Sequence, residues 1–189
     1  GGLATSRVLA GTIRRTGEEA DAARLAIELA QSGKNAREHA YAVASIAEAL
    51  EPYCSGMHVP ERPFVLELPN VLHLATDITG VAESAHSALA LASALHPSAA
   101  VCGTPRGAAR EIIARYEGID RGRYAGPVGW IDAHGDGEWA LALRCGRLTG
   151  PNELRLFAGV GIVADSDPSD EFAETAAKFV PMRDALGSG

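Results

Sequence analysis

The sequence predicts an α+β fold in which an antiparallel sheet is flanked by helices. Residues 18–116 are rich in alanine, and much of this zone spaces its apolar side chains three or four residues apart, as helices do. Residues 121–163 instead read as strands joined by turns that contain glycine. Short connections favour antiparallel pairing, and no strand–helix–strand alternation is visible. With 189 residues, the chain is long enough to bury a sizeable core as one domain.

Proline and glycine delimit the expected helices. We expect helices over residues 18–31, 35–50, 84–95, 106–116 and about 169–182. Ser32-Gly33 is expected to end the first, because glycine commonly follows a helix C-terminus. Pro105 and Pro168 precede the last two helices, where the first turn tolerates proline.

The expected strands form a meander in the second half of the chain. We expect strands over residues 124–132, 138–145 and 154–163. Glycine-containing turns at 134–137 and 149–152 would join them. Near the start of the chain, residues 5–10 read as one more strand that runs into a turn at Gly11-Thr12.

The composition argues against several classes of protein. A formal charge of −7 without a cluster of lysine and arginine argues against sequence-independent nucleic-acid binding. No window of about 18 apolar residues suggests a membrane span, and the first residues lack the apolar core of a signal peptide. Cys54, Cys102 and Cys145 lie more than 40 residues apart, which argues against a disulfide framework or a structural zinc site. We therefore expect a cytoplasmic protein that acts on small molecules.

The last expected helix carries two acids and a lysine on one stripe. Glu171, Glu174 and Lys178 follow i, i+3, i+7 spacing. This pattern is typical of a solvated face with an internal Glu–Lys pair. The alternative is a carboxylate pair for magnesium, which prefers oxygen ligands and is usually held by one or two carboxylates.

Three residues elsewhere carry chemistry that position alone leaves open. Glu38 borders the apolar face of its helix and is either an exposed acid or one that points into a cleft. His39 projects towards the apolar face, which favours a hydrogen-bonded core histidine. His73 lies in an apolar context, either in the core or as a donor to a substrate oxygen.

The expected strand 138–145 offers a site for an anion. Arg144 would project beside two alanines, with room for a carboxylate in front of its planar fork; a structural ion pair is the alternative. Gly159 and Gly161 would let backbone amides approach an anionic ligand, or simply mark a bulge. They lack the third glycine and the βαβ context of a dinucleotide site, so NAD binding is rejected.

Five segments together resemble the chorismate-utilising enzymes, the family of isochorismate, salicylate, anthranilate and aminodeoxychorismate synthases. These segments are residues 71–76 (VLHLAT), 95–103 (LHPSAAVCG), 119–130 (IDRGRYAGPVGW), 155–163 (RLFAGVGIV) and 171–178 (ExxETxxK). The resemblance covers nearly the whole chain and is strongest to isochorismate synthases. It implies that residues 1–189 are the C-terminal part of a single chorismate-binding domain, half of a fold with two packed sheets.

The resemblance also implies roles for particular residues. Glu38 and Glu174 match the acids that hold magnesium against the ring carboxylate of chorismate, and Glu171 matches one that supports the ion through water. Lys178 matches a residue near that metal, and His73 matches one beside the reacting ring.

Further roles concern the substrate. Arg144 and the amides around Gly159 and Gly161 match the site for the enolpyruvyl carboxylate. Tyr124 matches a pocket position that is aromatic in relatives. Ala100 stands where salicylate-forming relatives commonly carry threonine, which favours isochorismate as the final product.

The implied reaction is a magnesium-dependent exchange on the ring of chorismate. A lysine base activates water, which adds beside the carboxylate-bearing carbon, while the ring hydroxyl leaves with the help of a glutamic acid. The family places this base and acid in its N-terminal half, and the lysines here, Lys34 and Lys178, do not match the base. We therefore expect the N-terminal half as a partner, with poor turnover without it. The alternatives are a salicylate synthase, an ammonia-dependent anthranilate-type enzyme, and a non-catalytic chorismate-binding fragment.

Overall fold

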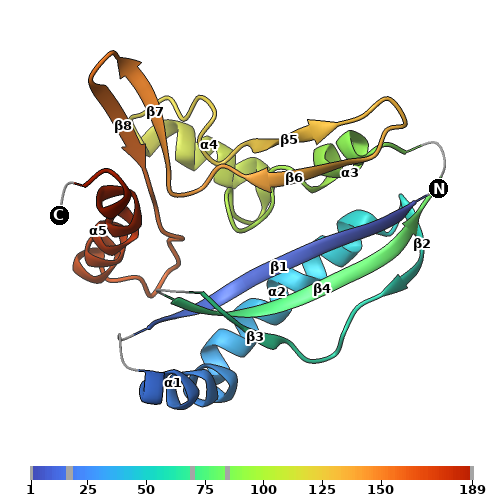
Figure 1. Cartoon of the computed structure of the whole chain (residues 1–189), viewed down its shortest axis with the longest axis horizontal. Helices are drawn as coiled ribbons and strands as arrows, with labels where there is room; N and C mark the ends of the chain where they lie inside the picture. Colours follow the sequence, from blue (N-terminus) through green and yellow to red (C-terminus); the bar gives the residue numbers. More distant parts are fainter. Residues whose placement is uncertain (1, 16–18, 69–70, 84–85, 188–189) are drawn as a thin grey trace. The chain divides into compact units, whose positions relative to one another are not determined.

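The structure is a computed structural model that describes residues 2–15, 19–68, 71–83 and 86–187. The chain divides into two compact units, whose helices and strands are labelled in Figure 1. Unit 1 comprises residues 1–99 and 131–138, and unit 2 comprises residues 100–130 and 139–189. That the whole chain belongs to a single domain stays a prediction.

Within the described residues, unit 1 is built around a four-stranded sheet. Its elements are β1 (Leu3–Arg14), α1 (Glu19–Gln31), α2 (Gly33–Leu50), β2 (Cys54–His58), β3 (Phe64–Glu67), β4 (Val71–Ala82) and α3 (Ala88–Leu95). Strand β4 lies at the centre of the sheet. It pairs with β1 along one edge and with β2 and β3 along the other, and every pairing is antiparallel.

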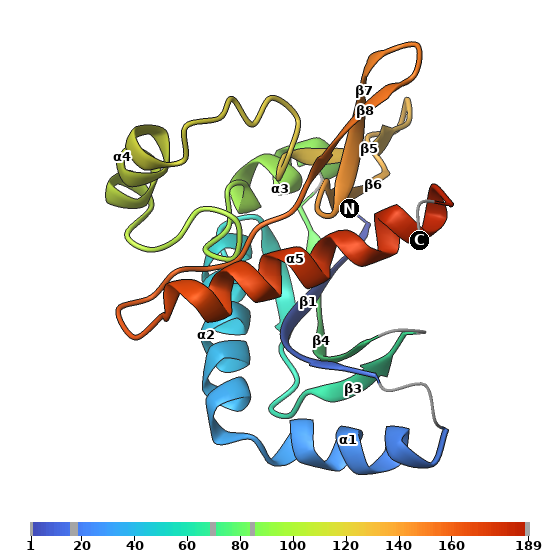
Figure 2. The same ribbon diagram turned by 90° about the vertical axis from the view of Figure 1, so that its left-hand side faces the viewer.

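Helices α1 and α2 cover one face of this sheet, as Figure 2 shows. Leu72 and Leu74 of β4 pack with Leu29 of α1, while Ile78 packs with Leu50 of α2. These side chains are almost fully buried, and such burial contributes about 1.5–3 kcal/mol per large apolar side chain. The core of unit 1 therefore lies between the helices and the even-numbered residues of β4.

The other face of the sheet presents apolar side chains to the surface. Leu3 and Leu9 of β1, Phe64 of β3 and Val81 of β4 are all exposed. They form two separate pairs, because Leu3 lies opposite Val81 while Leu9 and Phe64 flank Ala75 of β4. The ion pair between Arg7 and Asp77 lies between these two pairs.

A β-bulge interrupts β1 at Gly11. The pairing register with β4 shifts between Ala10 and Thr12, which lies opposite His73. Gly11 has a φ of 76°, and a Cβ there would lie 3.1 Å from the Cβ of Asn35. Only glycine fits both the left-handed backbone and the close approach to α2.

Unit 2 contains two helices and most of two hairpins. Its elements are α4 (Arg106–Tyr116), β5 (Pro127–Ile131), β6 (Gly137–Leu141), β7 (Cys145–Gly150), β8 (Glu153–Phe157) and α5 (Pro168–Ala185). Strand β5 pairs with β6, with their turn assigned to unit 1, and β7 pairs antiparallel with β8. The side chain of Asp167 caps α5 by accepting hydrogen bonds from the amides of Ser169 and Asp170.

The five predicted helices and the α+β class are confirmed. The helix predicted over 106–116 has those bounds, and the others differ by a few residues at either end. The predicted first residues of two helices, Glu18 and Ser84, lie outside the described residues. Ser32 has a different role from the expected one: its hydroxyl accepts a hydrogen bond from Asn35 N and so caps the start of α2.

The strand predictions are confirmed in part. The strands expected over residues 5–10, 124–132, 138–145 and 154–163 are present with other bounds as β1, β5, β6 and β8, whereas β2, β3, β4 and β7 were not predicted. Residues 54–82 form β2, β3 and β4, although this region reads as part of the helical zone. Because β4 is buried on both faces over much of its length, its apolar run lacks the alternation that marks a half-exposed strand. The predicted meander of three strands is instead a pair of separate hairpins, β5–β6 and β7–β8.

Two strand boundaries also differ. Strand β6 ends at Leu141, so Arg144 does not lie on a strand, and β8 ends at Phe157, before Gly159. No helix in the described ranges has both the length and the apolar character needed to cross a bilayer.

Candidate active site

Lys178 of α5 joins two of the predicted site residues in unit 2. Its Nζ lies 2.8 Å from Oε1 of Glu174, one turn earlier on the same helix. The same Nζ donates a hydrogen bond to the carbonyl oxygen of Gly159, 3.2 Å away. The lysine side chain is only 26% exposed, whereas Glu174 is 56% exposed. The internal Glu–Lys pair is therefore present, and it is also attached to the segment that follows β8.

Glu171 is held at the start of α5. The hydroxyl of Ser166 donates to its Oε1 at 2.6 Å and accepts a hydrogen bond from the amide of Val163. A carboxylate in the first turn of a helix is favoured by the unpaired amides there. Glu171 is thus oriented by a neighbour that the sequence analysis did not single out.

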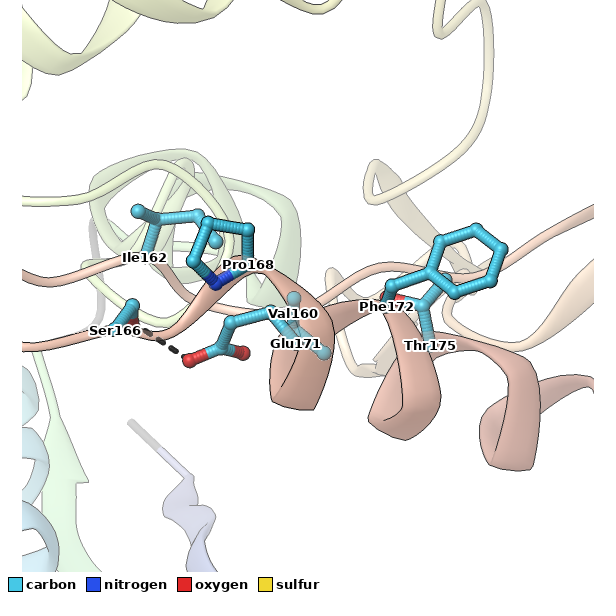
Figure 3. A pocket seen from close by; sticks show the side chains of 7 residues that line it. All are labelled: Val160, Ile162, Ser166, Pro168, Glu171, Phe172 and Thr175. Atoms are coloured by element: carbon cyan, nitrogen blue, oxygen red, sulfur yellow. Dashed lines mark hydrogen bonds between the residues drawn. The ribbon is translucent and has the colours of Figure 1, made fainter.

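A hollow of about 370 Å³ lies beside Glu171. Figure 3 shows its lining: Val160, Ile162, Ser166, Pro168, Glu171, Phe172 and Thr175. Most of these side chains are apolar, and Glu171 supplies the charged group. The hollow is therefore an open, mainly apolar surface with one carboxylate fixed at its edge.

Tyr124 approaches the same segment from another part of unit 2. Its ring stacks on Phe157, with centroids 5.4 Å apart and planes at 21°. Its hydroxyl oxygen lies 2.9 Å from the position that a Cβ on Gly159 would occupy, so a larger residue there would have to displace the Tyr124 hydroxyl. Burial raises the pKa of the Tyr124 phenol.

Arg144 lies at a bend between β6 and β7. The expected strand ends early because Ala142 pairs back with Ala125 and Gly126, after which the chain turns. Arg144 has a φ of 48°, a left-handed conformation that costs a non-glycine residue about 1 kcal/mol or more and is commoner at functional sites. Its side chain is half-buried, and the part of the chain that the structure describes contains no ion pair to it. The alternative of a structural ion pair therefore receives no support.

The two glycines after β8 differ in their surroundings. A Cβ on Gly161 would meet nothing within 4 Å, so space does not require glycine there. Among the described residues, neither the Gly159 amide nor the Gly161 amide donates a hydrogen bond. Both donors are thus available to an anion, the arrangement expected of backbone amides that bind a carboxylate.

His39 and His73 both belong to unit 1. His39 is 2% exposed; its Nδ1 donates to the carbonyl of Ala10 at 3.2 Å, and the Thr76 hydroxyl donates to its Nε2 at 2.8 Å. The prediction of a hydrogen-bonded core histidine is confirmed, and burial lowers the pKa of this ring. His73 is 8% exposed, and its Nδ1 shares a hydrogen bond of 2.9 Å with Oγ1 of Thr12. Its role beside a substrate ring stays a prediction.

The predicted site residues therefore fall into groups. Contacts within unit 2 connect Glu174, Lys178, Gly159 and Tyr124, and Glu171 lies one turn before Glu174. Unit 2 also contains Arg144, Gly161 and the exposed Ala100, without a described contact to that group. Glu38 is exposed on α2 and belongs to unit 1, so its convergence with Glu174 stays a prediction. Within the described ranges, no group of three acid, histidine or cysteine side chains forms a ready metal site.

Comparison with known proteins gives one consistent result. The isochorismate synthase DhbC from Bacillus subtilis is 44% identical over 183 residues, which are 96% of this chain and 46% of that protein. The salicylate biosynthesis isochorismate synthase of Pseudomonas aeruginosa is 44% identical over 99% of this chain and 39% of its own length. Among solved structures, the menaquinone-specific isochorismate synthase MenF from Escherichia coli superimposes with a TM-score of 0.88 and 34% identity, covering 96% of this chain and 41% of that one.

The chain thus spans less than half the length of each of these three proteins. The family model for chorismate binding enzymes matches residues 1–187, nearly the whole chain. The resemblance carried by the five sequence segments is confirmed. The chain belongs to the family of chorismate binding enzymes.

Proposed function

We propose that this chain is the substrate- and metal-binding part of an isochorismate synthase, which converts chorismate to isochorismate. The observation that carries the proposal is the contact chain Glu174–Lys178–Gly159–Tyr124. It connects four positions for which the family resemblance implies roles near chorismate. The names of the similar proteins support the same reaction.

The chain's own groups suit a dianionic substrate. The amides of Gly159 and Gly161 and the guanidinium of Arg144 are donors for the enolpyruvyl carboxylate. Tyr124, whose phenol pKa is raised by burial, offers a hydroxyl beside the glycine segment. Lys178 supplies a positive charge next to Glu174.

Magnesium is the proposed cofactor, and the donors fit it. Glu171 and Glu174 present carboxylate oxygens, and the described contacts engage only Oε1 of each. Hard cations prefer such oxygen ligands. Glu174 and Glu38 would hold the ion, and Glu171 would support it through water. Bound magnesium would neutralise the ring carboxylate and stabilise negative charge that develops there.

Water addition and hydroxyl loss also require a base and an acid. Lys178 is already paired with Glu174 and bonded to Gly159, which does not suit it to deprotonate water. We assign the base and the acid to an N-terminal half, the part of the relatives that this chain does not span. Unit 1 exposes two apolar pairs, Leu3–Val81 and Leu9–Phe64, and these support such a partner.

Pathway and compartment follow from the same proposal. Isochorismate feeds menaquinone or siderophore synthesis, in keeping with the names of the relatives, and we assign the protein to the cytoplasm. The salicylate synthase alternative differs in its products, because it would also release pyruvate. Ala100, in place of the threonine common in salicylate-forming relatives, favours isochorismate.

The deciding experiment incubates the chain with chorismate and magnesium, alone and with the complementary N-terminal segment of the Bacillus subtilis relative. We expect isochorismate without pyruvate from the complemented mixture and little turnover from the chain alone. Stoichiometric pyruvate and salicylate would instead identify the chain as part of a salicylate synthase. A dependence on ammonia would indicate an anthranilate-type enzyme, and binding without turnover would leave a chorismate-binding fragment.

Site variants sharpen this experiment. Glu171→Gln should raise the magnesium concentration for half-maximal activity by about 10–100-fold, the usual effect of losing a group that supports a metal through water. Glu174→Gln should cost more, because a direct ligand is lost. Asp170→Asn is the matched control, since Asp170 is an exposed acid on the same helix with no assigned role. Equal effects of all three changes would refute the magnesium assignment.

A further inference from the structure

Arg121 makes three kinds of contact inside unit 2 that no role in the proposed reaction yet explains. Its Nε and Nη2 donate to the two carboxylate oxygens of Glu117 at 2.6 and 2.8 Å, a bidentate pair. Its Nη1 donates to the carbonyl oxygen of Val101 at 2.8 Å. Its guanidinium carbon lies 5.7 Å from the centroid of the Tyr124 ring. The arginine side chain is 28% exposed, so these contacts are partly shielded from water.

These contacts join the residues on either side of Arg121 in sequence to the loop before α4, which lies 20 residues away. Glu117 follows the last turn of α4, Val101 lies in the loop before that helix, and Tyr124 precedes β5. The backbone adds one more constraint, because the amide of Tyr124 donates to the carbonyl of Arg121 at 2.8 Å. A planar guanidinium with fixed donor directions can hold three such partners in one arrangement, whereas a lysine ammonium cannot.

Two of these segments carry positions assigned to the substrate. Val101 directly follows Ala100, the position that favours isochorismate over salicylate, and Tyr124 is the aromatic position beside Gly159. We propose that Arg121 is a positioning residue that holds the Ala100 segment and the Tyr124 ring in a fixed arrangement. The part of this inference that concerns the substrate rests on the proposed function.

A purely local role would be to stabilise the end of α4 through the pair with Glu117. That role does not account for the bond to Val101 or for the approach to Tyr124. The difference can be measured at Tyr124 itself, because burial and the positive charge of Arg121 act on its phenol in opposite directions. Burial raises the pKa of the phenol, the guanidinium lowers it, and Glu117 and Cys145 raise it further.

The test is the alkaline titration of Tyr124 in the chain, followed by tyrosinate absorbance. Subtracting the spectrum of the same protein with Tyr124→Phe isolates this residue from the other tyrosines. In Arg121→Gln we expect the pKa of Tyr124 to fall towards its ordinary value of about 10, because the ring loses its buried position. A rise would show that Arg121 acts only as a neighbouring charge, and an unchanged value would show that it serves only α4. Either result would overturn the proposal.

Two further variants complete the design. Arg121→Lys keeps the charge but not the fork, and should give a fall at least as large, because the positive charge that lowers the phenol pKa is retained. Arg115→Gln is the matched control: it removes an exposed arginine of α4 that lies 5.2 Å over the Tyr116 ring, and should leave the pKa of Tyr124 unchanged. Arg121→Lys also replaces Arg121→Gln if that protein does not fold. No fall in Arg121→Lys would then count against the proposal.

Activity provides the second readout. In the complemented enzyme, Arg121→Lys should lower kcat/KM for chorismate by about 10²-fold, the effect of a small misplacement near reacting groups, and should raise the share of pyruvate. A loss confined to thermal stability, with unchanged kcat/KM and product ratio, would reduce Arg121 to a structural residue. If the complemented wild type converts no chorismate, the proposed function fails, and the Tyr124 titration still decides the role of Arg121.

Discussion

The two units of this chain differ in what holds them together. Unit 1 buries two clusters of apolar side chains, mostly leucines, between its sheet and helices α1 and α2. In unit 2 the buried apolar residues among those described are Ala125 and Phe157, and neither α4 nor α5 contains a buried residue. Yet most of the proposed site residues belong to unit 2. The comparison teaches that the folding core and the candidate chemistry reside in different parts of the chain.

Polar contacts take the place of a core in unit 2. Lys178, Ser166 and Arg121 each join segments through hydrogen bonds that leave much of the apolar surface exposed. Trp130 and Phe172 are among the large apolar side chains left exposed. Such a surface is unusual for a finished domain and is expected where a further segment packs. Unit 2 therefore depends more than unit 1 on the proposed N-terminal half.

The largest effect that tests this comparison is the loss of a core side chain from unit 1. Leu72→Ala should lower the free energy of unfolding by about 2–5 kcal/mol, because Leu72 is fully buried at the centre of the sheet. Leu148→Ala in unit 2 should change it by less than about 0.5 kcal/mol, because Leu148 is 75% exposed. Denaturant titration measures both. Similar decreases in the free energy of unfolding would contradict the conclusion that the folding core lies in unit 1.

A buried polar residue gives the next largest effect. His39→Ala should cost about 2–4 kcal/mol, because it creates a cavity and leaves the Thr76 hydroxyl and the Ala10 carbonyl without their partner. Ser166→Ala in unit 2 removes a half-buried hydroxyl and should cost no more than about 1 kcal/mol. Thermal unfolding of the two variants shows which one loses more stability. An equal loss in both would contradict the conclusion that unit 1 contains the main folding core.

Two glycines provide a smaller and closely matched pair. Gly11→Ala should destabilise by about 1–3 kcal/mol, because its φ is 76° and a Cβ would press on Asn35. Gly161→Ala meets open space and should leave stability within about 0.5 kcal/mol. In the complemented enzyme, however, Gly161→Ala should weaken chorismate binding. If Gly161→Ala is stable and its KM for chorismate is unchanged, Gly161 does not contribute to the carboxylate site.

The smallest effect concerns the exposed pair between Arg7 and Asp77. Their bidentate contact at 2.7 Å holds the pKa of Asp77 below its ordinary value. The pair therefore contributes stability above about pH 4, the unfolded carboxyl range, and loses it as the pH falls through the lower folded pKa. Arg7→Gln should be slightly less stable than wild type at pH 7 and equal to it in strong acid. A difference that grows in acid would contradict this sign.

Helices were more predictable than strands for a physical reason. Proline, glycine and capping residues mark helix ends locally, so residues 106–116 could be delimited from sequence alone. Strand β4 gives no such signal, because burial on both faces removes its alternation and its partners lie far away in sequence. The end of β6 was missed because the pairing of Ala142 with Ala125 and Gly126 depends on a distant loop.

The candidate site was predictable to a similar degree. The stripe Glu171–Glu174–Lys178 follows from helical spacing, and its internal ion pair is present. The sequence pattern did not indicate that Lys178 reaches Gly159, or that a side chain at this position would press on the Tyr124 hydroxyl. Arg121 was missed as well, although its position four residues after Glu117 is a signal for an ion pair.

The bulge in β1 sets which side chains meet His73. Up to Leu9 the odd-numbered residues of β1 lie on the face away from the helices, but beyond Gly11 the even-numbered residue Thr12 takes that place. If β1 kept Gly11 but lost the bulge, Gly11 itself would lie opposite His73, and every later residue of β1 would shift by one position along β4. Thr12 and Ile13 would exchange sides, placing a hydroxyl against the leucine core and an alkyl group on the face of the imidazole.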